Sequence, residues 1–152
     1  MLTTYMAWLV AMTTMLGNLP TGGCIQPAEL LCVQEISYNK KDVGELARIV
    51  YWEARGESEQ GQLAVANVVL NRVRHDAWPD SICGVIYQKH QFTPTKNKRY
   101  SKVHVPEQYR EIARRALDGE KAVDDDTVYF SRGRGSYGNG WRKIGQHWFG
   151  RE

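Results

Sequence analysis

The stretch from Leu63 to Val73, LAVANVVLNRV, would be apolar on nearly every face if it formed a helix. A helix that is apolar all round is normally buried at the centre of a domain, because a surface helix needs one polar face. Ser58 precedes this stretch as a residue type that caps helix N-termini, and Pro79 stops the helix from continuing. The sequence therefore predicts one buried central helix against which the rest of the fold packs.

Capping residues and helix breakers place the other elements. Asp42 and Glu45 have the spacing of a capping box, and Gly56 is a suitable helix terminator. Four glycines between Ser131 and Gly140 predict a loop there, and a long polar loop is expected over 88–100. We expect helices over 43–55, 58–73, 81–87 and 107–118, and short strands over 128–130 and 144–149. This pattern is typical of a mostly helical α+β single domain.

Composition is that of an ordinary globular domain. The chain has 152 residues, of which 42% are apolar and 24% charged, so a disordered chain is excluded. The formal net charge of +3 suits an anionic polymer but is too weak to indicate nucleic-acid binding.

The N-terminal residues have the character of an export signal. The first 24 residues contain no Asp, Glu, Lys or Arg, and Tyr5 to Leu16 is an apolar run too short for a comfortable membrane span. We predict a signal sequence over 1–23, a linker over 24–40 and the compact domain over 41–152, with an N-terminal core helix as the alternative. Export would allow Cys32 and Cys83 to pair, with Cys24 cleaved off, lipidated or free.

The segment 51–57, YWEARGE, is the strongest candidate for chemistry. A carboxyl pressed against aromatic surface has a raised pKa and can donate a proton near neutrality. Glu53 follows Trp52 directly and is the better candidate for an acid. Glu57 lies beyond Gly56, where we expect a solvated turn. Two helix-end glutamates that merely pair with a neighbouring arginine remain the alternative interpretation.

Other residues are candidates for substrate contact. Gln91, Phe92 and Thr93 have side chains suited to lining a cleft, although Phe92 is equally suited to the core. Tyr129 and His147 are further candidates, with structural roles as the alternative. A basic run is suited either to an anionic ligand or to a solvated face; its members are Arg132, Arg134, Arg142 and Lys143.

Nothing in the sequence predicts a metal or cofactor. The four histidines are scattered, without HExxH or Cys-x-x-Cys spacing, and residues 124–126 lack the full calcium-loop pattern.

Three motifs in order resemble one known family. These are EARGE at 53–57 with the apolar helix that follows it, GVIY at 84–87, and IGQHWF at 144–149; Gln91-Phe92-Thr93 adds to the match. Over about 42–150 the chain resembles the cell-wall hydrolase family that includes the spore cortex-lytic enzymes of the SleB type. It departs in lacking their peptidoglycan-binding repeats and in a basic, glycine-rich segment over 129–139.

The resemblance implies a lysozyme-like fold related to lytic transglycosylases. It also implies cleavage of peptidoglycan between N-acetylmuramic acid and N-acetylglucosamine, with Glu53 as the catalytic acid. We expect an exported monomer that needs no cofactor. Membrane association would come only through the N-terminal signal or a lipid anchor.

The number of catalytic carboxylates separates two mechanisms. A retaining hydrolase needs a second carboxylate about 5 Å from the first, and an inverting one needs it further away. Glu57 is the nearest candidate in sequence, and the acidic run 124–126 is a more distant one. A lytic transglycosylase needs no second carboxylate, because the 6-hydroxyl of the substrate attacks. The weak case for Glu57 favours the transglycosylase.

Two other classes of function compete with glycan cleavage. A wall amidase or peptidase would require a zinc cluster or a Cys–His pair, and Cys83 lies in an apolar segment suited to burial. A wall-binding module would keep the fold without activity.

Overall fold

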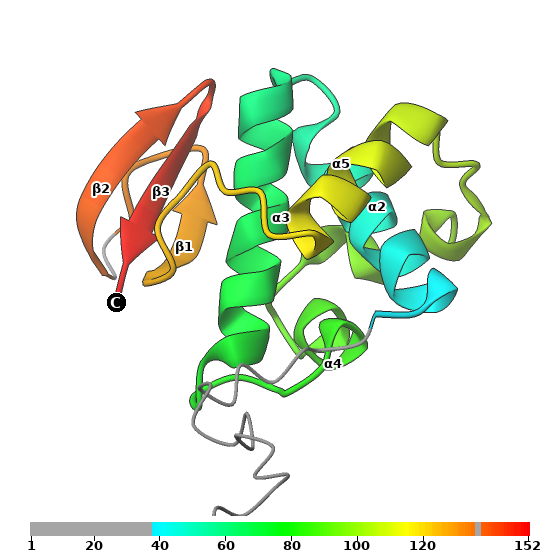
Figure 1. Cartoon of the computed structure of the whole chain (residues 1–152), viewed down its shortest axis with the longest axis horizontal. Helices are drawn as coiled ribbons and strands as arrows, with labels where there is room; N and C mark the ends of the chain where they lie inside the picture. The colour runs from blue at the N-terminus through cyan, green and yellow to red at the C-terminus, as the bar shows by residue number, and fades with distance from the viewer. Residues whose placement is uncertain (1–37, 136–137) are drawn as a thin grey trace, which may run out of the picture. The chain divides into compact units, whose positions relative to one another are not determined.

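The fold is organised around the helix α3, Glu59–Arg74, as the sequence predicts (Figure 1). Every residue of α3 from Gly61 to Val73 is buried, and the Ser58 hydroxyl accepts a hydrogen bond from the Gly61 N–H at its start. The computed structural model describes residues 38–135 and 138–152, which all fall in one compact unit. The predicted signal sequence and most of the predicted linker lie outside the described residues.

Two helices pack against one side of α3. They are α2, Lys40–Ala54, and α5, Glu107–Leu117, and they also pack against each other. The capping box of α2 lies one turn earlier than predicted. The Asn39 side chain accepts a hydrogen bond from the Asp42 N–H, and the Asp42 carboxylate accepts one from the Asn39 N–H. The same three-residue spacing occurs twice in succession here, and the sequence interpretation took the second occurrence.

The connection from α3 to α5 is built from short helical pieces. The helix α4, Ile82–Tyr87, is capped by Ser81. The predicted loop over 88–100 contains the 3-10 helix η2, Thr93–Lys96, and leads into a second one, η3, Tyr100–Lys102.

A three-stranded antiparallel sheet lies on the other side of α3, in the order β1-β3-β2 (Figure 1). Its strands are β1, Thr127–Ser131, β2, Asn139–Ile144, and β3, His147–Arg151. The sheet contacts α3 through β1.

The prediction of one strand over 144–149 is wrong. Gly145 has a positive φ of 60°, which reverses the chain between Ile144 and His147 and makes two strands of that segment. The prediction of loop over 131–140 is also wrong at its end, because β2 begins at Asn139. Most of β2 is exposed and polar, so it lacks the alternation of apolar residues by which strands are recognised.

Three buried polar side chains on α3 hold the chain that leads into the sheet. Asn67 bonds to the backbone of Glu120 and Ala122 at 2.9 and 2.7 Å. Asn71 donates to the Thr127 carbonyl at 2.9 Å, and Arg72 Nε donates to the Val128 carbonyl at 2.7 Å. These bonds satisfy buried backbone groups and fix β1 against the central helix.

No helix in the described part of the chain is long and apolar enough to span a bilayer. Cys83 forms no disulfide within the described residues, and its predicted partner Cys32 lies outside them.

Candidate active site

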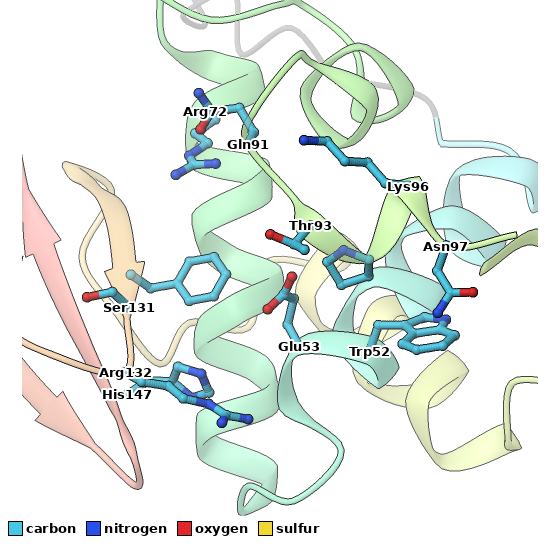
Figure 2. A pocket seen from close by; sticks show the side chains of 12 residues that line it. Trp52, Glu53, Arg72, Gln91, Thr93, Lys96, Asn97, Ser131, Arg132 and His147 are labelled. Atoms are coloured by element: carbon cyan, nitrogen blue, oxygen red, sulfur yellow. The ribbon is translucent and has the colours of Figure 1, made fainter. Parts of the chain in front are cut away.

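A cleft of about 670 Å³ opens between the helices and the sheet. Four segments supply its walls: the end of α2, the C-terminal part of α3, the η2 region, and the strands β1 and β3. Figure 2 shows the side chains that line it, with Glu53 near the centre. The lining residues are Trp52, Glu53, Arg72, Gln91, Thr93, Pro94, Lys96, Asn97, Phe130, Ser131, Arg132 and His147.

Glu53 is the one carboxyl-bearing residue among those that line the cleft. It lies in the last turn of α2, half-buried, and its carboxyl points into the cleft toward Thr93 (Figure 2). Burial raises the pKa of Glu53 above its usual value, and the positive charge of Arg132 opposes part of this effect. A carboxyl with a raised pKa is suited to proton donation near neutral pH.

The raised pKa of Glu53 predicts a pH-dependent change in stability. A carboxyl whose pKa is higher in the folded than in the unfolded chain contributes stability at low pH, and this contribution is lost as pH rises through the folded-state value. We therefore expect Glu53→Gln to raise the Tm at pH 8 and to change it less at pH 4. Thermal unfolding followed by circular dichroism at both pH values measures the difference. An equal change in Tm at the two values would contradict the prediction.

Glu57 is not the solvated residue that the sequence suggests. Its side chain is only 6% exposed, and its Oε2 accepts a hydrogen bond of 3.0 Å from the Gln146 N–H. Its Oε1 lies 3.3 Å from Nδ1 of His147. Glu57 does not line the cleft, so its position supports a structural role: it joins the turn after α2 to the turn between β2 and β3.

His147 is buried at the start of β3 and contributes to the cleft. Its ring meets Phe130 edge-on, with centroids 5.8 Å apart. Burial lowers the pKa of His147 and Arg132 adds to this effect, while the carboxylate of Glu57 opposes it. The neutral imidazole is therefore favoured in the cleft, with Glu57 behind it.

Gly145 is required for the close approach of Glu57 to the turn between β2 and β3. A Cβ at this position would lie 1.9 Å from Oε2 of Glu57, and its φ of 60° is strained for any other residue type. We expect Gly145→Ala to lower the free energy of unfolding by at least about 2 kcal/mol. Chemical denaturation measures this, with Gly133→Ala as the matched control, because open space surrounds Gly133. Equal stabilities of the two variants would show that the turn relaxes freely.

The predicted substrate-contact residues separate into two groups. Gln91, Thr93 and His147 line the cleft, whereas Phe92 and Tyr129 do not. Phe92 is 2% exposed and packs on Phe130 with ring centroids 6.1 Å apart, so it belongs to the core. Tyr129 is not among the lining residues, and its ring lies beside Gly138, where an added Cβ would come within 2.7 Å of it.

Several lining residues were not proposed as contacts from the sequence. The clearest is Arg72, the one charged residue in the largely apolar stretch from Leu63 to Val73, which is a signal in itself. Pro94, Lys96 and Asn97 lie in a segment that sequence patterns indicate only as a loop. Within the described residues, no group of three or more His, Cys, Asp or Glu side chains is placed to hold a metal ion.

A helical domain with a small antiparallel sheet, and one carboxyl in the cleft between them, is a lysozyme-like α+β domain. The chain belongs to the cell wall hydrolase family, whose family model matches residues 56–150. The match begins just after Glu53, so the family assignment does not itself include that residue.

Several curated relatives are spore cortex-lytic enzymes. That of Halalkalibacterium halodurans is 34% identical over 117 residues, which cover 74% of this chain and 35% of the relative. The chain thus spans about a third of the length of this relative.

Two solved structures share the fold. The catalytic domain of the Bacillus cereus SleB protein gives a TM-score of 0.67 at 28% identity, covering 76% of this chain and 94% of that domain. The catalytic domain of the germination-specific lytic transglycosylase SleB from Bacillus anthracis gives a TM-score of 0.66 at 28% identity. The match covers 76% of this chain and 98% of that domain.

Proposed function

We propose that this chain cleaves the glycan strands of peptidoglycan between N-acetylmuramic acid and N-acetylglucosamine, with Glu53 as the proton donor. The observation that carries the proposal is the single cleft carboxyl with a raised pKa, in a domain of the cell wall hydrolase family. The relatives named as spore cortex-lytic enzymes and as a lytic transglycosylase support the same chemistry. Such a substrate lies outside the cytoplasm, so the proposal includes export.

The proposed reaction needs one carboxyl in two successive roles. Glu53 gives its proton to the bridging oxygen as the bond from that oxygen to C1 of muramic acid breaks and positive charge develops on the sugar ring. The resulting carboxylate then takes the proton of the 6-hydroxyl while O6 bonds to C1. The products are a free 4-hydroxyl and a 1,6-anhydro ring, and Glu53 is protonated again.

The neighbours of Glu53 are suited to binding an amide-rich sugar. Gln91 and Asn97 offer amide groups and Thr93 a hydroxyl, all in the cleft, and these groups can bond to acetamido substituents. Phe92 acts indirectly, since it packs behind Phe130. For Tyr129 we propose no direct contact, because it is not among the residues that line the cleft.

Digestion of purified wall tests the proposal. We expect mass spectrometry of the soluble products to show cut glycan with intact peptide stems, in the presence or absence of EDTA. The Glu53→Gln variant serves as the control. Whole glycan with cut stems would instead show an amidase, provided that this activity is lost on chelation and restored by zinc. Wall that is bound but uncut by the wild-type chain would show a binding module.

A further inference from the structure

The charge of the cleft is mainly positive. Arg72, Lys96 and Arg132 line it, opposed by Glu53 alone. Burial raises the pKa of Glu53, which shifts its carboxyl toward the neutral acid and weakens the one opposing charge. The two N-acetylated sugar rings carry no charge, so glycan rings alone do not account for three cations. The cleft is complementary to a ligand with negative charge.

Arg72 is a buried cation without a counter-ion in the described part of the chain. Its residue is 5% exposed, and Nη1 is buried with no hydrogen-bond partner. Its guanidinium lies 4.2 Å from the ring centroid of Trp78 and 5.5 Å from that of Phe92, while Nε is held by the Val128 carbonyl. Burial lowers the pKa of Arg72 to about 10, so the charge remains at neutral pH.

A buried charge is costly unless a hydrogen-bonded partner compensates it. Here the guanidinium is fixed in orientation by aromatic rings and a carbonyl, yet one of its donors is unused. A carboxylate that enters the cleft would supply both the missing charge and the missing acceptor. Arginine binds carboxylates through paired N–H donors, which suits this geometry.

Arg132 and Lys96 supply exposed positive charge in the same cleft as Arg72. Each lines the cleft, and neither forms an ion pair with any other described residue. Figure 2 shows Arg132 beside His147 and Arg72 beside Gln91, with Glu53 between the two pairs. The other members of the basic run, Arg134, Arg142 and Lys143, do not line the cleft.

We propose that Arg72, Arg132 and Lys96 bind the carboxylates of peptide stems, so that the cleft selects glycan whose muramic acid residues carry stems. This inference rests on the proposed function. The stem is attached to the sugar next to the bond that is cut, so its carboxylates arrive with the substrate. Neutralisation of the stem carboxylates should therefore weaken binding without changing the sugars.

Three soluble, uncrosslinked glycan preparations test the selection, each freed of phosphate-containing wall polymers. One carries intact stems, one has stem carboxylates converted to primary amides, and one has stems removed by an amidase and the lactyl carboxylates thereby exposed on muramic acid converted to primary amides. We expect kcat/KM to fall by about tenfold on the second and third, mostly through KM, because a charge-assisted bond is lost. Equal kcat/KM on all three would overturn the proposal.

Variants assign the effect to residues. We expect the double variant Arg132→Gln, Lys96→Gln to cut intact-stem and stem-free glycan with equal kcat/KM, so that the tenfold preference disappears. Lys143→Gln is the matched control, since it is exposed and outside the cleft, and it should keep the preference. A double variant that still prefers intact stems would overturn the assignment.

Arg72 requires a folding check because it also holds β1. Arg72→Lys keeps the charge but loses the paired donors, and circular dichroism separates misfolding from lost selection.

Binding measured with the Glu53→Gln chain needs no turnover. Selective binding of stem-bearing strands that the wild type does not cut would overturn the proposed function and leave this inference standing. Binding without selection would overturn the inference alone.

Discussion

Replacing Glu53 with glutamine should lower the rate of glycan cleavage by about 10³-fold, the contribution of a well-placed general acid. Glutamine keeps the shape and one acceptor of the side chain but has no transferable proton. No other carboxyl lines the cleft among the described residues, so none is placed to substitute. Release of soluble fragments from purified wall measures the loss. Unchanged circular dichroism would show that the fold is intact.

Glu57→Gln is the matched control for Glu53→Gln. The two glutamates belong to the same motif, but Glu57 faces the Gln146 N–H and His147 rather than the cleft. A glutamine oxygen can still accept the bond from Gln146, so we expect measurable activity and a modest loss of stability. An inactive Glu57→Gln beside an active Glu53→Gln would invert the assignment.

Elements with strong local signals were predicted well from the sequence. The helix α3 is recognised because an uninterrupted apolar run follows a serine cap, and α5 because Pro106 opens it and Gly119 closes it. The boundary between β2 and β3 was missed, since it depends on the positive φ of a single glycine within an apparently continuous pattern.

The environment of each glutamate could not be predicted in the same way. Glu57 is buried by a turn 89 residues later in the chain, and only the packed fold brings the two together. Its carboxyl fits because Gly61 and Gly145 have no side chains there. The burial of Arg72 likewise depends on Trp78, Phe92 and β1, which no local pattern around residue 72 specifies.

The glycan fragments should end in 1,6-anhydro-N-acetylmuramic acid. A hydrolase needs a second carboxylate to act as nucleophile or to activate water. Glu57 accepts the Gln146 N–H and does not line the cleft, and the acidic run 124–126 does not line it either. The 6-hydroxyl belongs to the substrate itself and reaches C1 without a protein base other than the carboxylate left on Glu53.

Mass spectrometry distinguishes the two products directly. Hydrolysis adds one water, about 18 Da, at each cut, whereas intramolecular attack adds none. A mixture would show that water competes with the 6-hydroxyl for the same charged intermediate, and an excess of the anhydro form would still support the transglycosylase. Fragments that carry only reducing-end muramic acid would contradict it. A water-activating group would then be required, and His147 would be the first residue to replace, because it lines the cleft, its lowered pKa keeps the imidazole neutral, and the Glu57 carboxylate lies 3.3 Å behind it.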